Sequence, residues 1–185
     1  MTPGSLKVAI LTCSDRCHAG MTVDTSGPAL ARMVCRRLGA QVIACACVPD
    51  EIDAIRAQVE RWTSPPEAPD LILTTGGTGL APRDVTPEAI APLLERRLPA
   101  LLELARYRCY AKTPRACLSR GEAGTVGRTL IISLPGSERG ATEMLEAIVD
   151  ILPHAILTLR GEPTVHEHDQ RPGADAGRDA ERASP

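Results

Sequence analysis

Aromatic residues are almost absent from this 185-residue chain, which has no Phe, one Trp and two Tyr. A site that holds a flat ring between aromatic side chains needs such residues, and so does a platform that stacks nucleic-acid bases. The net charge is only −2, so no broad positive field is available for a nucleic-acid backbone. We therefore expect no nucleic acid among the partners, and we disfavour a flavin electron carrier.

Long apolar runs are also missing: none is long enough to cross a bilayer, and no secretory signal pattern precedes Leu6. The seven cysteines are an odd number, and Cys13, Cys35, Cys45 and Cys47 lie in apolar stretches. We expect buried free thiols in a reducing compartment, with the last two in the core because they share one strand face. These features predict a cytoplasmic protein with no membrane association.

The remaining pattern alternates apolar strands with amphipathic helices, which predicts an α/β fold. We expect a three-layer α/β/α sandwich with a mostly parallel sheet and right-handed connections. The expected strands are 6–13, 40–48, 70–75 and 129–134, and the expected helices are 27–38 after a Ser26 cap, one after Asp50 that runs through Trp62, 86–97, 99–109 and 140–159.

Three further expectations concern the second half of the chain. The stretch 111–128 is expected to be irregular, with a short extended pair or a bulge near Cys117 and Val126. Pro153 should kink or split the last helix. Residues 1–163 should form one domain and 164–185 a disordered tail, because almost no apolar residue follows Thr164.

The most informative segment is 74–88, with the sequence TTGGTGLAPRDVTPE, which follows an apolar strand and precedes a helix start. Gly76, Gly77 and Gly79 let the main chain approach a ligand and point N–H groups at it. Arg83 and Asp84 add one charge of each sign beside this loop. The combination predicts a phosphate site with a metal-binding or proton-handling carboxylate. No Lys follows the glycines, so the phosphate-binding Walker pattern is absent and N–H groups, Arg and a divalent metal would have to neutralise the charge.

Ligands in open α/β sheets bind outside the carboxyl ends of the strands. Four loops leave such ends, at 14–27, 49–50, 76–86 and 135–137, and we expect them on one rim. Plain structural interpretations stay open for three of them. Asp50 can be a helix N-cap, and the first and last loops can be simple turns. Thr86 is expected to cap a helix. The run HEHD at 166–169 lies in the polar tail, where a fortuitous cluster is the better interpretation than a metal site.

Several motifs together carry a family resemblance. TGGTG at 75–79 with RDVTPE at 83–88 resembles the signature of the MogA/MoaB family of molybdenum-cofactor biosynthesis proteins. Three further segments resemble the family's other blocks. They are TCSD at 12–15 with DTSGP at 24–28, VPD at 48–50, and LSR at 118–120 with Gly124 and LPGS at 134–137. The resemblance covers about residues 6–161. One departure is Glu138-Arg139-Gly140, where many relatives carry a second Pro or a Lys; an acid there would not help to bind phosphate.

This resemblance implies a homotrimer that binds molybdopterin, a pterin with a dithiolene and a terminal phosphate. It implies, for the adenylyltransferase branch, Mg²⁺-dependent transfer of AMP from ATP to that phosphate, with release of pyrophosphate. The adenylylated pterin would then pass to a molybdate-inserting enzyme. The alternative is a MoaB-type carrier or scaffold that binds the pterin without turnover.

The resemblance also implies site residues. Asp50 and Asp84 fall on the family's two functionally important aspartates, and we predict both as catalytic and metal-binding residues. The predicted substrate-binding residues lie in the four rim loops and in the LSR block: Ser14, Asp15, Asp24, Ser26, Gly27, Thr75, Gly76, Gly77, Thr78, Gly79, Arg83, Ser119, Arg120, Pro135, Gly136 and Ser137.

Overall fold

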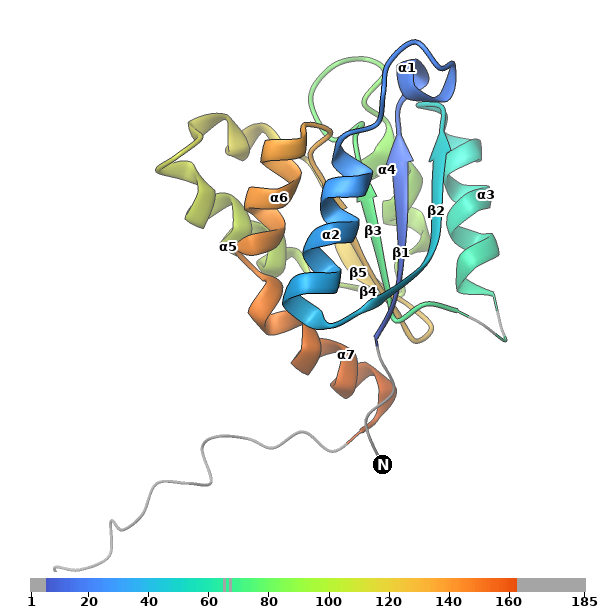
Figure 1. Cartoon of the computed structure of the whole chain (residues 1–185), viewed down its shortest axis with the longest axis vertical. Helices are drawn as coiled ribbons and strands as arrows, with labels where there is room; N and C mark the ends of the chain where they lie inside the picture. The colour runs from blue at the N-terminus through green and yellow to red at the C-terminus, as the bar shows by residue number, and fades with distance from the viewer. Residues whose placement is uncertain (1–5, 65, 67, 163–185) are drawn as a thin grey trace, which may run out of the picture.

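A computed structural model describes residues 6–64, 66 and 68–162 of the chain, and its six-stranded sheet has the order β2-β1-β3-β6-β5-β4. The expected α/β/α arrangement is confirmed, with helices on both faces of the sheet (Figure 1). The strands are β1 (Lys7–Cys13), β2 (Gln41–Val48), β3 (Leu71–Thr75), β4 (Arg96–Arg97), β5 (Ala123–Val126) and β6 (Thr129–Leu134).

The centre of the sheet consists of β1, β3 and β6, which pair in parallel. Their residues are almost all buried, because helices cover both faces, and the strands therefore appear in the sequence as continuous apolar runs. β2 adds a parallel edge, while β5 and β4 add an antiparallel edge. The residues of β5 were expected in a mostly irregular stretch, and those of β4 at the end of a helix.

The described part of the chain contains seven α-helices. They are α1 (Asp15–His18), α2 (Ser26–Leu38), α3 (Ile52–Thr63), α4 (Thr86–Ile90), α5 (Pro99–Tyr110), α6 (Glu138–Glu146) and α7 (Leu152–Arg160), with 3₁₀ turns η1 (Ala91–Leu93), η2 (Pro114–Leu118) and η3 (Val149–Ile151). Helices α6 and α7 follow the last strand. One core lies between the sheet and α2, α5, α6 and α7, and a smaller core lies beneath α3 and α4.

Some predicted boundaries were wrong. The helix expected over 86–97 ends at Ile90 and gives way to η1 and β4, and α1 forms inside the expected first loop. Extended chain was expected near Cys117 and Val126: Cys117 lies in η2 instead, whereas Val126 is extended in β5 and pairs with β6. The split near Pro153 is confirmed, because this proline sits in the first turn of α7, where a missing N–H costs little.

The cysteine prediction was right about the absence of disulfides in the described chain and partly wrong about burial. Cys13 is buried, whereas Cys35 and Cys45 are exposed and Cys47 is half-buried. For Cys45 and Cys47 the error arises because β2 is an edge strand without buried residues and not a central strand, whereas Cys35 lies on the exposed side of α2. A shared strand face therefore did not mean a core position.

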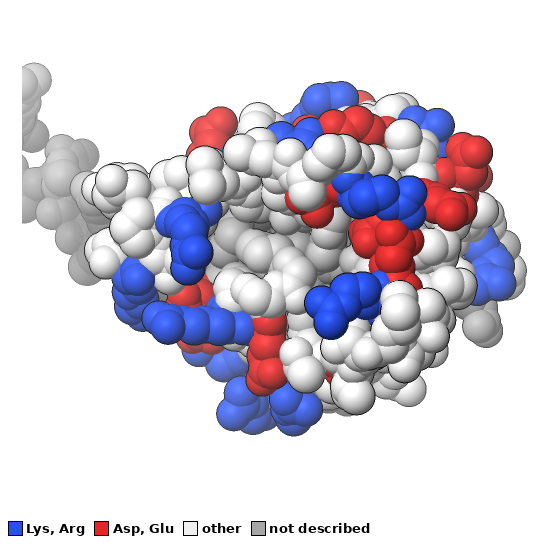
Figure 2. Space-filling view, turned by 90° about the horizontal axis from the view of Figure 1, so that it is seen from above, with Lys and Arg blue, Asp and Glu red and all other residues white. Residues whose placement is uncertain are grey.

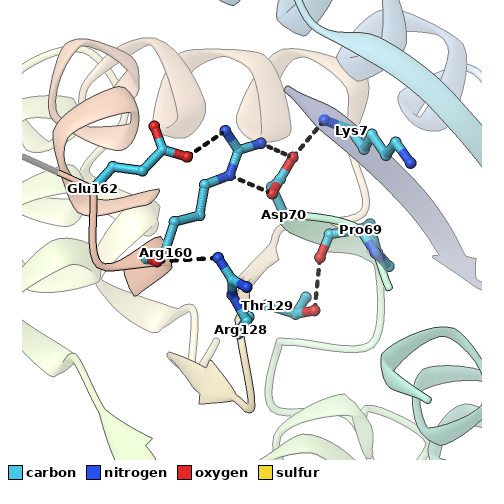
Figure 3. A network of polar contacts seen from close by, with 7 residues as sticks. All are labelled: Lys7, Pro69, Asp70, Arg128, Thr129, Arg160 and Glu162. Atoms are coloured by element: carbon cyan, nitrogen blue, oxygen red, sulfur yellow. Dashed lines mark hydrogen bonds and ion pairs between the residues drawn. The ribbon is translucent and has the colours of Figure 1, made fainter. Parts of the chain in front are cut away.

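The amino ends of the strands are tied to the end of α7 by a polar network (Figure 3). Asp70 accepts hydrogen bonds from the backbone N–H of Lys7 and from the guanidinium of Arg160. The Thr129 hydroxyl donates to the Pro69 carbonyl across 2.6 Å. This end of the sheet is thus closed by internal contacts, which leaves the opposite end, where the parallel strands terminate, for a site.

None of the helices in residues 6–162 that the structure describes is long and apolar enough to cross a membrane. The tail expected from Thr164 onward and the HEHD run at 166–169 lie outside the described residues.

Candidate functional site

The loops that leave β1, β2, β3 and β6 meet at one end of the sheet, as expected for parallel strands. The N–H of Ser14 donates to the carbonyl of Val48, and the N–H of Gly76 donates to that of Leu134. The Thr75 hydroxyl also donates to the Pro135 carbonyl, across 2.7 Å. Figure 2 looks onto this end and shows a hollow with mostly uncharged walls, ringed by acidic and basic side chains.

Two cavities lie side by side at this rim and share Gly77 and Gly136. The first, of about 400 Å³, lies between the glycine loop and helices α5, η2 and α6. The second, of about 350 Å³, lies between β1, the 22–26 segment and Asp50. A ridge of main chain with little side-chain bulk therefore separates two compartments that an elongated ligand, or two ligands, can occupy together.

Most of the predicted site residues line one of these two cavities. Thr78, Gly79, Asp84, Ser119, Pro135 and Ser137 line the first, while Ser14, Asp24, Ser26, Asp50, Thr75 and Gly76 line the second. Gly27 lines a neighbouring hollow beside β2. Asp15, Arg83 and Arg120 line neither cavity, and their side chains are engaged with other protein groups.

Sequence reasoning missed the far wall of the first cavity, which Cys109, Thr113, Arg115, Glu143 and Met144 form. These residues belong to α5, α6 and the segment around η2. They follow no strand and match none of the quoted motifs, so the only signal for them was the amphipathic pattern of the two helices, which predicts burial without predicting a cavity.

The conformation of the glycine loop requires glycine at two successive positions. Gly76 and Gly77 have φ values of 102° and 59°. A Cβ on Gly76 would overlap the carbonyl oxygen of Cys13, and one on Gly77 would overlap the Thr86 hydroxyl. That hydroxyl donates to the Gly76 carbonyl across 2.9 Å. The expected helix cap at Thr86 is therefore wrong: Val85 occupies the cap position of α4, and Thr86 holds the loop instead.

Asp50 and Asp15 are joined by reciprocal hydrogen bonds. The N–H of Asp15 lies 2.9 Å from Oδ2 of Asp50, and the N–H of Asp50 lies 3.0 Å from Oδ1 of Asp15. The guanidinium of Arg83 then binds both carboxylate oxygens of Asp15, at 2.6–2.9 Å. The N-cap interpretation of Asp50 is wrong, because Glu51 occupies the cap position of α3.

The other carboxylate oxygen of Asp50, Oδ1, has no hydrogen-bond partner among the described residues, although it is buried. It lies 3.1 Å from the position that a Cβ of Gly77 would take. Partial burial raises the pKa of Asp50, and the nearby charge of Asp15 adds to this effect. By contrast, the hydrogen bond from Arg83 lowers the pKa of Asp15. An unpaired carboxylate oxygen beside a bare glycine is suited to a cation or a hydrogen-bond donor of a ligand.

Asp84 lies on the other side of the ridge, where it lines the first cavity. Its Oδ2 accepts a hydrogen bond from the N–H of Ala81 at 2.8 Å, which fixes the carboxylate within its own turn. Arg120 braces the same loop: its guanidinium donates to the carbonyls of Gly79 and Asp84 and binds Glu88. The guanidinium of Arg120 therefore stabilises the loop through internal contacts.

The first loop is organised by Asp24, whose carboxylate accepts from the Thr12 and Ser26 hydroxyls and from the N–H of Gly27. The expected cap by Ser26 is therefore wrong, since Ser26 is the first residue of α2 and Asp24 supplies the acceptor for the helix start. Asp24 thus fixes one wall of the second cavity while meeting the unsatisfied donors of the helix.

Two serines of the rim combine a capping role with a place in a cavity wall. Ser14 accepts from the N–H of Cys17 at the start of α1, and Ser137 accepts from the N–H of Gly140 at the start of α6. Glu138, the departure from the family pattern, lines neither rim cavity and lies 3.9 Å from Arg32. The acid at this position therefore does not face the glycine loop.

Two carboxylates of the rim, Asp50 and Asp84, suit a hard divalent cation that takes its other oxygen ligands from a substrate and from water. Within residues 6–162 as described, no group of three or more His, Cys, Asp or Glu could hold a metal. Mg²⁺ is commonly bound by one or two carboxylates together with substrate phosphates and water. The unpartnered oxygen of Asp50 and the carboxylate of Asp84 match that mode, provided that a phosphate-bearing ligand supplies the remaining oxygens.

The fold and rim therefore define a class: a parallel α/β domain whose glycine loop separates two ligand compartments flanked by carboxylates. A family described as "Probable molybdopterin binding domain" matches residues 9–154. The chain belongs to the MogA/MoaB family of molybdenum-cofactor biosynthesis proteins.

Individual relatives agree with this assignment. The molybdopterin adenylyltransferase of Helicobacter pylori (strain ATCC 700392 / 26695) is 34% identical over 158 residues, which cover 85% of this chain and 89% of that protein. The crystal structure of the molybdopterin biosynthesis enzyme MoaB from Thermus thermophilus is 49% identical, with a TM-score of 0.80, and the match covers 85% of this chain and 98% of that one.

Longer relatives contain a similar segment. The molybdenum cofactor synthesis protein cinnamon of Drosophila melanogaster is 42% identical over 152 residues, which are 82% of this chain and 25% of that protein. The chain spans between about a quarter and a half of the length of three such relatives.

Proposed function

We propose that this chain is a molybdopterin adenylyltransferase, which transfers AMP from ATP to the terminal phosphate of molybdopterin and releases pyrophosphate. The observation that carries the proposal is the pair of cavities that meet at Gly77 and Gly136, with Asp50 in one and Asp84 in the other. Such a pair can hold two anionic substrates with their reacting phosphates at the shared ridge. The name of the Helicobacter pylori relative supports the same activity.

The chemistry needs positioning more than it needs a protein nucleophile. An oxygen of the pterin phosphate attacks the α-phosphorus of ATP, a new P–O bond forms, and the bond to the β-phosphate oxygen breaks as pyrophosphate leaves. Both reactants are anionic, so their repulsion has to be reduced. N–H groups of the loop at Gly77 and Gly79 are suited to that role. Asp50 and Asp84 would hold Mg²⁺, which supplies positive charge next to the phosphates when it is bound.

The predicted substrate-binding residues that line one of the two rim cavities are part of this proposal. Those that line the first cavity, including Ser119 and Ser137, would contact one substrate. Those that line the second, including Ser14, Asp24 and Ser26, would contact the other. We also propose that residues 1–163 form the catalytic domain, that three copies assemble into a trimer, and that the adenylylated product is handed to a molybdate-inserting enzyme.

The decisive experiment incubates the purified protein with molybdopterin, ATP and Mg²⁺ and follows the AMP–pterin adduct and pyrophosphate by chromatography. We expect both products to form in equal amounts and EDTA to stop their formation. Catalytically inert protein that binds the pterin tightly would contradict the proposal.

That second outcome defines the alternative function, a MoaB-type pterin carrier or scaffold without turnover. The 49% identity to MoaB of Thermus thermophilus is the reason to keep a MoaB-type alternative. Binding of molybdopterin without adduct, in the presence of ATP and Mg²⁺, is the result expected for a carrier.

A further inference from the structure

The Asp15–Asp50 pair has a geometry that suits positioning better than ligand contact. The two residues are 35 positions apart and come from different rim loops. Each backbone N–H donates to the carboxylate of the other residue, at 2.9 and 3.0 Å. The N–H of Asp15 binds Oδ2 of Asp50, whereas Oδ1 has no hydrogen-bond partner among the described residues and lies beside Gly77.

We infer that Asp15 and Arg83 are positioning residues, which hold the carboxylate of Asp50 with one oxygen directed at the Gly77 ridge, and that they do not contact the substrates. The inference rests on the proposed function for its activity measurement. Neither residue lines either rim cavity, whereas Asp50 lines the second.

Arg83 has a defined part in this arrangement. Without a partner, the charge of Asp15 would repel the neighbouring charge of Asp50. The guanidinium takes both oxygens of Asp15 in a bidentate geometry, which balances that charge and fixes the orientation of the carboxylate. Since Oδ1 of Asp15 also accepts the N–H of Asp50, the guanidinium, the two carboxylates and the two amides form one connected set.

Because the Arg83–Asp15 ion pair is exposed, its effect on the position of Asp50 can be distinguished from an effect on overall stability. The side chain of Arg83 is 61% exposed and that of Asp15 is 38% exposed. Exposed ion pairs contribute little to the free energy of unfolding. Loss of this pair should therefore leave the fold intact and change the orientation of Asp50, and small misplacements of a group at a reacting centre can lower turnover strongly.

The test compares Asp15→Ala, Asp15→Asn and Arg83→Met with the wild type. Asp15→Ala removes the acceptor for the Asp50 N–H, whereas Asp15→Asn keeps one oxygen acceptor for that N–H, removes the charge and replaces the second oxygen that binds Arg83 with an amide NH2. We expect kcat for adduct formation to fall by about tenfold or more in Asp15→Ala, with KM for both substrates changed less than about threefold. Asp15→Asn should recover a large part of that loss, and Arg83→Met should lie between the wild type and Asp15→Ala. Asp150→Ala, which removes an exposed partner of Arg37 remote from the rim, is the matched control.

A second readout does not depend on activity. In ¹H–¹⁵N spectra, the amide of Asp50 should move upfield and exchange faster in Asp15→Ala but stay close to its wild-type position in Asp15→Asn. An unchanged kcat, or a rise in KM at constant kcat, would overturn the inference, because the latter indicates direct substrate contact. An unchanged Asp50 amide in Asp15→Ala would overturn it as well.

If wild-type protein makes no adduct, the proposed function fails, and the amide measurement still decides whether Asp15 holds Asp50. If Asp15→Ala does not fold, Arg83→Met provides the same comparison, and an unchanged kcat in that variant would overturn the inference.

Discussion

Arg160, the last residue of α7, binds the carboxylate of Asp70 with two nitrogens of its guanidinium. Nε lies 2.8 Å from Oδ1 and Nη2 lies 2.5 Å from Oδ2. Both side chains are only 14% exposed. Because Asp70 also accepts the N–H of Lys7, the pair fixes the end of α7 to the beginnings of β1 and β3 (Figure 3).

Arg160→Ala should therefore destabilise the protein. The substitution leaves a largely buried carboxylate without its charged partner, and the free energy of unfolding should fall by about 3 kcal/mol. Arg139→Ala is the control, since Arg139 is 74% exposed and its i,i+4 pair with Glu143 should contribute less than about 0.5 kcal/mol. Urea denaturation followed by circular dichroism measures both. Equal effects of the two substitutions would show that Asp70 is not held by this contact.

Gly76→Ala should disrupt the glycine loop. At a φ of 102° a Cβ is strained, and it would also overlap the carbonyl of Cys13. Gly127 is the matched control: its φ is also positive, at 55°, but nothing lies within 4 Å of an added Cβ. We expect Gly127→Ala to cost about 1 kcal/mol and Gly76→Ala at least about 2 kcal/mol more. A similar cost at both positions, measured by thermal or urea unfolding, would mean that the loop can move away from β1.

Asp84→Asn should reduce adenylylation by about tenfold or more while the fold remains intact, because the amide keeps the size of the carboxylate but removes its charge. Asp53→Asn is a suitable control, as Asp53 is an exposed acid in the first turn of α3. Adduct formation and circular dichroism should be recorded for both. Wild-type activity in Asp84→Asn would make Asp84 a structural residue and remove it from the proposed site.

The cysteines should differ sharply in reactivity. Burial raises the pKa of the Cys13 thiol to about 12, so this group stays protonated and a poor nucleophile from pH 7 to pH 9. The exposed thiols of Cys35 and Cys117 should be alkylated by iodoacetamide at pH 8 within minutes, and Cys13 only after unfolding. Peptide mass spectrometry with and without urea measures the difference. Rapid labelling of Cys13 in the native protein would show that β1 opens locally.

Much of the central fold could be predicted because its signals are local. The runs that became β1, β3 and β6 each contain at least three consecutive apolar residues, and each is followed by a polar turn, by glycine or by Pro-Gly. The edges of the sheet were harder to predict. β4 has only two residues, and β2 is as apolar in sequence as a buried strand although none of its residues is buried. The position of a strand within a sheet depends on its neighbours in space and not on its own composition.

The candidate site shows the same division. The glycines at 76 and 77 could be singled out from the sequence, because a backbone with positive φ near other main-chain atoms has few alternatives to glycine. The partner of Asp50 could not be predicted. An aspartate at position 50 is compatible both with a helix cap and with a reciprocal contact to Asp15. Only the packing of the two loops decides between these roles.

The amino-acid sequence by itself determined the α/β class, the family, the glycine loop and the set of polar rim residues, because these follow from local periodicity, backbone sterics and short motifs. The tertiary structure decided which rim residues face a cavity and which hold their neighbours. Arg83 binds a carboxylate 68 positions away, and Asp50 exchanges hydrogen bonds with the same residue across 35 positions. Contacts at such separations exist only once the strands have paired and brought their carboxyl ends together, so no local pattern in the chain encodes them.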